Sequence, residues 1–217
     1  MSGFGRLVAD VLVVDDRAVV AQAVAAALVE RGHPARVMVE PLLGGDVPDA
    51  GEPPGVAVVA LDDHAPALVR TLVGAGWRCV VLGPADRRLE IAACLEAGAL
   101  GHVGYGDGLD ELVAALDAVG IGVTRLMAEH DRQELFAELR TSRSASARAL
   151  APFDRLTPRE REVLAGLVDG ARADDIAAAS FVSVATVRNQ IQSVLTKLDV
   201  RSQLEAVAKA NRAGWRG

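Results

Sequence analysis

Short apolar runs alternate with segments of helical periodicity along the first 120 residues. Residues 11–14 form a continuous apolar run typical of a buried parallel strand, and residues 17–31 repeat their apolar positions at helical spacing before Gly32. The same alternation predicts strands at 35–40, 56–61, 79–82 and 100–103, and helices at about 65–75, 86–97 and 109–119. Such repeated strand–helix units predict an α/β fold, with a parallel sheet covered by helices on both faces.

The segment 41–55 interrupts this alternation where a crossover helix is expected. It contains four prolines and four glycines, which disfavour a regular helix. Structureless loops of this length in compact domains are usually functional or disordered. Two interpretations follow: a site where a small-molecule ligand or a partner protein acts, and a disordered loop without a ligand.

A change in composition divides the rest of the chain. Residues 124–140 predict a connecting helix, and the small polar residues of 141–151 are typical of a flexible linker. We therefore expect a first domain at 1–120, a helical or flexible linker at 121–151, and a small all-α domain at 152–217.

The last domain has clear signals for the start of its helices. Thr157, Pro158 and Glu160 combine an N-cap residue, a proline at the first helical position and a glutamate at the third. Ser202 and Glu205 form a second capping box of the same kind. The signals predict four short helices, from 158 to about 170, at about 174–179, at 184–198 and at about 203–213.

Composition excludes several classes of protein. The chain is 51% hydrophobic and can bury a core, but its most apolar stretch, residues 18–29, is shorter than the roughly 20 residues of a membrane span. Cys79 and Cys94 have the spacing of neither a disulfide framework nor a zinc site. No nucleotide-binding or nucleophile motif occurs, and His64 and His102 lack a nucleophilic partner. We expect a cytoplasmic protein that is not an enzyme and has no membrane segment, metal or cofactor.

The distribution of charge and of polar side chains makes the helix at 184–198 a candidate for binding DNA. Residues 1–120 carry 8 basic and 17 acidic residues, whereas residues 183–217 carry six basic and two acidic ones. The polar face of that helix has no acidic residue and carries side chains that bind bases and phosphates in DNA. They are Asn189, Gln192, Ser193 and Thr196, with Arg188 and Lys197 flanking them. The alternative is an ordinary amphipathic surface helix.

A longer pattern around this helix carries a family resemblance. It includes the run LTPREREVL from Leu156, Ile176-Ala177, Ser183-x-x-Thr186-Val187-Arg188 and Leu195-x-Lys197-Leu198. Without gaps from Leu156 to Val207, the chain resembles the LuxR/NarL-type helix-turn-helix family. The resemblance implies base contacts from Arg188, Asn189 and Gln192, phosphate contacts from Thr186, Lys197 and Arg201, and a dimerisation helix in which Ala206 and Ala210 allow close approach.

The run VLVVDD at 11–16, followed by strand–helix repeats, resembles the receiver domain of bacterial response regulators. The resemblance implies a flavodoxin-like sheet in which Asp15 and Asp16 are the acidic pair that holds Mg²⁺. It also implies a phosphate-accepting aspartate after the third strand, a hydroxyl after the fourth and a lysine after the fifth.

This set is incomplete in the present chain. Gly83 stands where the hydroxyl residue belongs, and Tyr105 stands where the lysine belongs. Counting from Pro54 puts Ala60 at the acceptor position, whereas a shift of two residues puts Asp62 there. We favour Ala60, and the hydroxyl and the lysine are missing in either alignment.

The leading hypothesis is a transcription regulator that binds a two-fold operator in double-stranded DNA as a homodimer. Its receiver-like domain would work without phosphate, by dimerising or by binding a small ligand or a partner protein. One alternative is a conventional response regulator that is phosphorylated on Asp62 by a sensor kinase. Another is an interaction protein whose helix-turn-helix domain has lost DNA binding.

Overall fold

The computed structural model describes residues 10–39, 48, 50–51 and 54–217. The chain forms two compact units, an N-terminal unit at Met1–Leu139 and a C-terminal unit at Arg140–Gly217. The N-terminal unit runs past residue 120 because Leu135 and Leu139 are buried in its core. Among the described residues, no helix is both long and apolar enough to cross a membrane.

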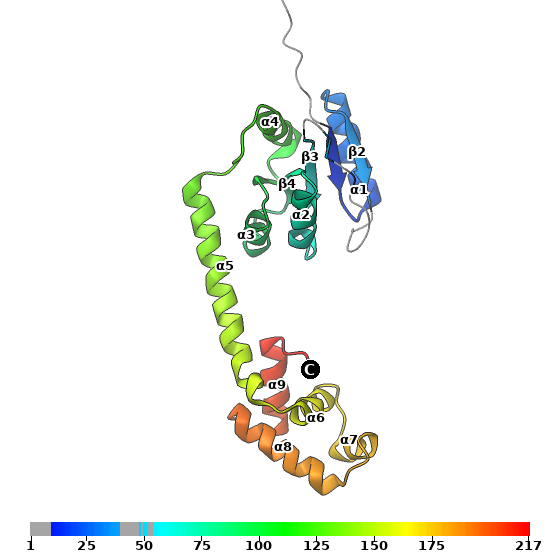
Figure 1. Ribbon diagram of the computed structural model, residues 1–217, viewed down its shortest axis with the longest axis vertical. Coiled ribbons are helices and arrows are strands. Elements are labelled where there is room, and N and C mark those ends of the chain that lie inside the picture. The colour runs from blue at the N-terminus through cyan, green and yellow to red at the C-terminus, as the bar shows by residue number, and fades with distance from the viewer. Residues whose placement is uncertain (1–9, 40–47, 49, 52–53) are drawn as a thin grey trace, which may run out of the picture. The chain divides into compact units, whose positions relative to one another are not determined.

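Five parallel strands form the sheet of the N-terminal unit (Figure 1). Their order is β2-β1-β3-β4-β5. This is the order of flavodoxin-like folds, in which ligands bind beyond the carboxyl ends of the strands, and it confirms the predicted α/β fold class. The strands are β1 (Val11–Val14), β2 (Ala35–Met38), β3 (Val56–Ala60), β4 (Arg78–Gly83) and β5 (Gly101–Gly104).

Helices cover both faces of the sheet because successive strand residues point to opposite sides. In β1, Val11 and Val13 join one core cluster with the helices α1 and α4, whereas Leu12 and Val14 join another with α2, α3 and α5. The helices are α1 (Ala18–Glu30), α2 (Ala65–Gly74), α3 (Arg88–Glu96), α4 (Gly108–Gly120) and α5 (Glu129–Leu150).

The helix α5 corrects one prediction. The connecting helix was expected to end near residue 140, but α5 continues to Leu150, so 141–150 is helical and not an irregular linker. The segment contains neither glycine nor proline, and its alanines and arginines favour helix. Its side chains from 143 to 150 are all exposed.

The predicted loop at 41–55 lies for most of its length outside the described residues. Among its described residues, the carbonyl oxygen of Pro48 accepts a hydrogen bond of 2.7 Å from Nε1 of the buried Trp77. The interpretation of this loop as a ligand site stays a prediction.

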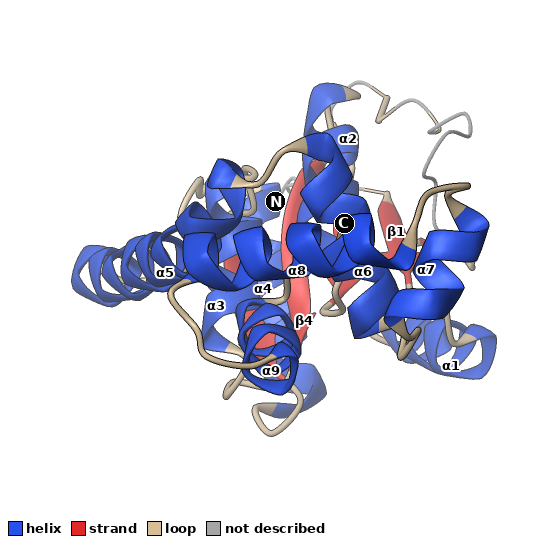
Figure 2. Cartoon of the chain, turned by 90° about the horizontal axis from the view of Figure 1, so that it is seen from below, coloured by secondary structure: helices blue, strands red, loops and turns tan. Residues whose placement is uncertain are grey.

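The C-terminal unit contains the four predicted helices (Figure 2). It also contains a short 3-10 turn, η1 (Ala151–Arg155), in which Phe153 is buried. Both predicted capping residues are in place, since Thr157 Oγ1 accepts from Glu160 N and Ser202 Oγ accepts from Glu205 N. The helices are α6 (Pro158–Val168), α7 (Ala173–Ala179), α8 (Val184–Leu198) and α9 (Gln203–Ala213).

Candidate nucleic-acid interface and acidic pocket

One side of α8 presents polar side chains to solvent. Thr186, Arg188, Asn189 and Gln192 are all exposed, whereas Val187 on the opposite side is buried. Arg188 and Gln192 also line an open groove beside α8. The structure therefore exposes four of the six predicted DNA-binding residues along α8.

The beginning of α8 is held by its own side chains. Ser183 Oγ accepts a hydrogen bond of 3.1 Å from Thr186 N, and the two hydroxyl oxygens lie 2.8 Å apart. Because the amide groups at a helix N-terminus attract anions, this end of α8 suits an approach to phosphate or to base edges.

Lys197 and Ser193 are bound inside the C-terminal unit by Glu160 of α6. Lys197 Nζ donates to Glu160 Oε2 at 2.6 Å, and Ser193 Oγ donates to Glu160 Oε1 at 2.5 Å. Ser193 was expected on the exposed face of the helix, and it is half-buried instead. A phosphate contact from Lys197 would have to compete with this ion pair.

The carboxylate of Glu160 is buried, and both of its oxygens accept hydrogen bonds. Thr157 N also donates to it, at 2.7 Å. Burial alone raises the pKa of Glu160, but the hydrogen bonds from Lys197, Ser193 and Thr157 outweigh it and lower the pKa to about 2. Glu160 therefore stays ionised and ties α6 to α8.

The prediction that Ala206 and Ala210 of α9 allow close approach of a second chain is wrong. Ala206 and Ala210 are completely buried in the core of their own unit, because this side of α9 packs against the unit's other helices. They cannot line an interface with another chain. The exposed side of α9 instead carries Leu204, which is 79% exposed. Arg201, just before α9, has an exposed side chain, so its phosphate contact stays a prediction.

At the carboxyl end of the sheet, Arg17 fills the acidic pocket. Its Nε and NH2 atoms donate to the two carboxylate oxygens of Asp15, each at 2.9 Å, and its backbone N–H donates to Asp15 as well. Burial raises the pKa of Asp15, but these bonds outweigh it and lower the pKa below the usual value. Asp16 points to solvent.

The guanidinium of Arg17 also contacts the residue that follows the fifth strand. Its NH2 atom donates to the hydroxyl oxygen of Tyr105 at 2.9 Å. Both oxygens of Asp15 accept hydrogen bonds from this guanidinium, so a Mg²⁺ ion bound by Asp15 would have to displace Arg17. Sequence reasoning missed Arg17, although an arginine directly after the acidic pair was a visible signal.

The strand register decides which residue stands beside Asp15. Val14, the last residue of β1, pairs with Val59, so Asp15 directly after β1 lies at the level of Ala60, the last residue of β3. Asp62 has another role, since its Oδ1 atom accepts hydrogen bonds of 2.7 Å from the backbone N–H groups of His64 and Ala65 at the start of α2.

Gly83 ends β4 in a space that has no room for a hydroxyl side chain. A Cβ atom at this position would lie only 2.4 Å from Cβ of Leu61. Serine or threonine would therefore require Leu61 to move. Tyr105 follows β5 and is 47% exposed. The structure thus brings the six predicted pocket residues to one end of the sheet, with Asp62 belonging to the cap of α2.

Comparison with known proteins gives a family match for the C-terminal residues. Residues 154–210 match the bacterial regulatory proteins of the luxR family. The chain is 28% identical over 140 residues to the transcriptional regulatory protein DesR of Bacillus subtilis, covering 64% of this chain and 63% of DesR. It is 32% identical over 136 residues to the probable HTH-type transcriptional regulator GfsR of Streptomyces halstedii, covering 55% and 56% of the two chains. The chain thus spans less than two thirds of the length of these relatives.

Two solved structures are similar over most of the chain. The response regulator ChrA of a heme-sensing two-component system has 23% identity and a TM-score of 0.46, over 95% of this chain and 98% of that one. The response regulator RcsB in a DNA complex has 20% identity and a TM-score of 0.42, over 94% and 98%.

Proposed function

We propose that the chain is a DNA-binding transcription regulator whose α8 enters the major groove of double-stranded DNA, because residues 154–210 match the bacterial regulatory proteins of the luxR family. The observation that carries the proposal is the exposed, acid-free side of α8 with Thr186, Arg188, Asn189 and Gln192. Arginine bonds to guanine and asparagine or glutamine to adenine, so this side suits direct readout of a base sequence. Selection of bound duplexes from a random pool by the full chain tests it.

The N-terminal unit is proposed to act without phosphorylation. Three features support this: Ala60 ends β3, the guanidinium of Arg17 is hydrogen-bonded to the carboxylate of Asp15, and Leu61 fills the space beside Gly83. An aspartyl phosphate needs a carboxylate acceptor, a divalent cation and groups that neutralise the transferred charge. The alternative, phosphorylation of Asp62, would require this carboxylate to leave the cap of α2.

Incubation with acetyl phosphate and Mg²⁺ tests this part of the proposal. We expect no mass increase of one phosphoryl group by intact-protein mass spectrometry, and unchanged DNA binding for Asp62→Asn, because asparagine can also cap α2. A phosphorylated species that disappears in Asp62→Asn would support the conventional response regulator instead.

Dimerisation is proposed through the outer side of α1. From Ala18 to Val29 this helix has no charged residue, and Val19 and Val29 are 79% and 54% exposed. An open apolar groove of about 310 Å³ lies between α1 and α4, lined in part by Val24 and Leu109. Two chains related by a two-fold axis could cover this surface symmetrically. The two C-terminal units of such a dimer would then bind two half-sites of one DNA operator together. Binding of a small ligand or partner protein here is the second candidate.

Val19→Glu should convert a micromolar dimer of the full chain into a monomer. The substitution places two like charges in an apolar contact, whereas in a single chain a glutamate in the first turn of α1 suits the helix dipole. Analytical ultracentrifugation measures the result. Thr71→Glu, at an exposed position of α2, is the matched control and should stay dimeric. A native chain that sediments as a monomer contradicts a constitutive dimer.

A further inference from the structure

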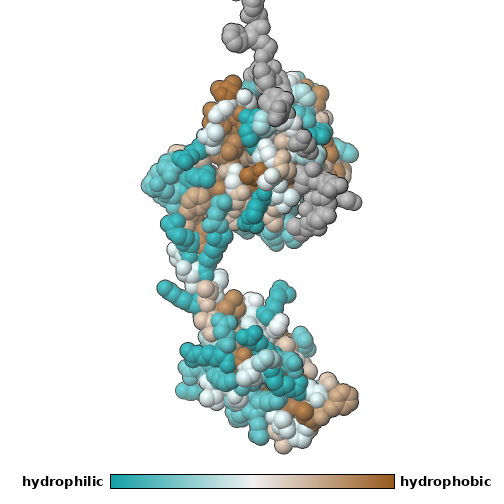
Figure 3. Space-filling model, in the orientation of Figure 1, coloured by the Kyte–Doolittle hydropathy of each residue, from teal (hydrophilic) through white to brown (hydrophobic). Residues whose placement is uncertain are grey.

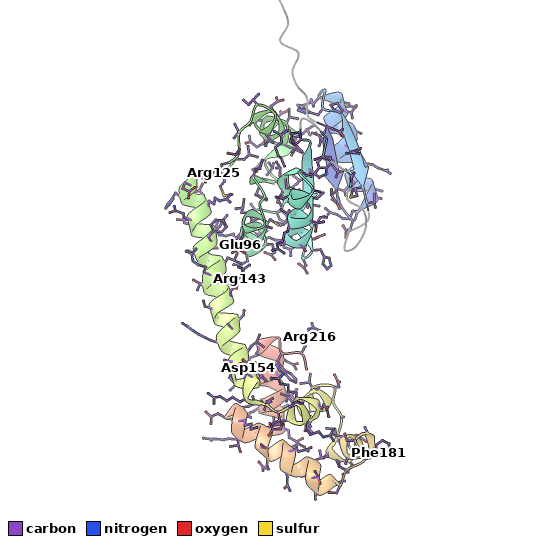
Figure 4. All side chains as sticks on the ribbon, in the orientation of Figure 1. Glu96, Arg125, Arg143, Asp154, Phe181 and Arg216 are labelled. Carbon is purple, nitrogen blue, oxygen red and sulfur yellow. The ribbon has the colours of Figure 1, made fainter. Side chains whose placement is uncertain are left out.

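Phe181, in the turn between α7 and α8, has an unusual combination of conformation and exposure (Figure 4). Its side chain is 97% exposed, and its backbone φ is +54°, in the left-handed region. Among the described residues other than glycine, Asp199 alone shares a positive φ. Aspartate, asparagine and glycine tolerate this region, but phenylalanine does so only with strain. Both the conformation and the exposed ring disfavour phenylalanine for stability alone.

Backbone hydrogen bonds hold the turn that carries Phe181. Val182 N donates to Ala177 O at 3.1 Å, Phe181 N donates to Ala178 O at 3.3 Å, and Ser183 then caps α8. Figure 3 shows a brown apolar spot at the end of the C-terminal unit, on a surface that is otherwise mostly hydrophilic. Phe181 and the partly exposed Val182 are the large apolar residues of this turn.

Chain connectivity keeps the ring close to the proposed DNA surface. Phe181 precedes the N-cap Ser183 by two residues and Ala185 by four, so their Cα atoms lie within about 7 Å and 14 Å of that of Phe181. The major groove is about 12 Å wide. When the first turn of α8 lies in the groove, Phe181 therefore lies at or near the groove edge.

We propose that Phe181 contacts the 5-methyl group of a thymine at the edge of the major groove and thereby contributes to sequence preference. The inference rests on the proposed function. Thymine is the base that presents a methyl group in this groove, and phenylalanine is among the side chains that pack against it. No acidic residue lies between 176 and 198 to repel the DNA. One ring and Val182 are too little surface for a stable protein interface, which needs about 800 Å² per partner.

The test compares two duplexes and three chains. One duplex is selected from a random pool by the full native chain, and the other has the same sequence with deoxyuridine in place of each thymidine, which removes only the methyl groups. Phe181→Asn relieves the left-handed conformation and removes the ring, whereas Phe181→Tyr keeps the ring. Ile121→Asn, which changes another exposed apolar residue, 86% exposed in the N-terminal unit, is the control. Thermal unfolding checks that every variant folds.

If Phe181 contacts a thymine methyl group, removing the ring and removing the methyl group should weaken DNA binding by the same contact and should not add. The native chain should bind the uridine duplex about fourfold more weakly per contacted methyl group. Phe181→Asn should bind the thymidine duplex about fourfold more weakly than the native chain does, and it should bind the deoxyuridine duplex no more weakly than the native chain binds that duplex. The salt dependence of binding should be unchanged, because an apolar contact releases no counterions. Phe181→Tyr and Ile121→Asn should behave like the native chain.

Two other outcomes have different meanings. If Phe181→Asn binds the thymidine duplex as tightly as the native chain, or if its loss adds fully to the loss from uridine, the thymine contact is wrong and the proposed function stands. A folded native chain that selects no duplex contradicts the proposed function itself.

Discussion

Glu160→Gln should lower the free energy of unfolding of the C-terminal unit by about 3 kcal/mol at pH 7. The substitution keeps the size of the side chain but removes the charge that holds Lys197 and Ser193. The figure is at the lower end for a broken buried ion pair because Lys197 is about one third exposed, at 32%. Chemical denaturation followed by circular dichroism measures it.

The pH dependence gives an independent readout. The pKa of Glu160 falls from 4.5 in a free side chain to about 2 in the folded chain, so the folded state binds the proton less readily than the unfolded state. The stabilisation is therefore complete above about pH 5 and is lost as the pH falls toward 2. The difference in stability between the native chain and Glu160→Gln should shrink over this window.

The control is Glu162→Gln on the same helix. Glu162 is 61% exposed and pairs with Arg159 at the surface, so its loss should cost under about 0.5 kcal/mol. If both variants are equally stable across the pH range, Glu160 does not tie α6 to α8.

The sheet could be predicted from the sequence because both of its faces are buried. Strands such as 11–14 and 56–60 are continuous apolar runs, and such runs occur where helices cover both sides. The helix starts of the C-terminal unit were also predictable, since Thr157, Ser183 and Ser202 cap their own helices through neighbours only three residues away. Local chemistry of this kind is visible in one sequence.

Contacts between distant residues could not be predicted in the same way. A helical projection gives the direction of Lys197 and Ser193 but not the presence of Glu160, more than 30 residues earlier. Similarly, the bond between Arg17 and Tyr105 joins residues 88 positions apart.

Alanine is ambiguous for a related reason. A small side chain allows close approach both to another chain and to a helix of the same chain. Ala206 and Ala210 have the second role, and nothing in the sequence of α9 distinguishes the two. Most polar residues of α8 are exposed as predicted, because polarity on one side of a helix indicates exposure, but Ser193 and Lys197 are half-buried beside Glu160.

Arg188→Ala should weaken binding to a selected duplex by roughly 1–3 kcal/mol, a loss of about 5-fold to 160-fold, and relax the preference at one base pair. Arg188 is exposed on the same side of α8 as Asn189 and Gln192, where it can donate two hydrogen bonds to guanine. Fluorescence anisotropy with the selected duplex and its single-base variants measures both effects.

Arg201→Ala should behave differently, because a phosphate contact carries no sequence information. Binding should weaken similarly for all duplexes, and the slope of log affinity against log salt should fall by about one. Lys197→Ala should act mainly through stability, since its ammonium is bound to Glu160. Arg70→Ala, which removes an exposed arginine of α2, controls for net charge. If Arg188→Ala and Arg70→Ala bind every duplex equally well, α8 does not read bases through Arg188, and the assignment of this helix to the major groove is wrong.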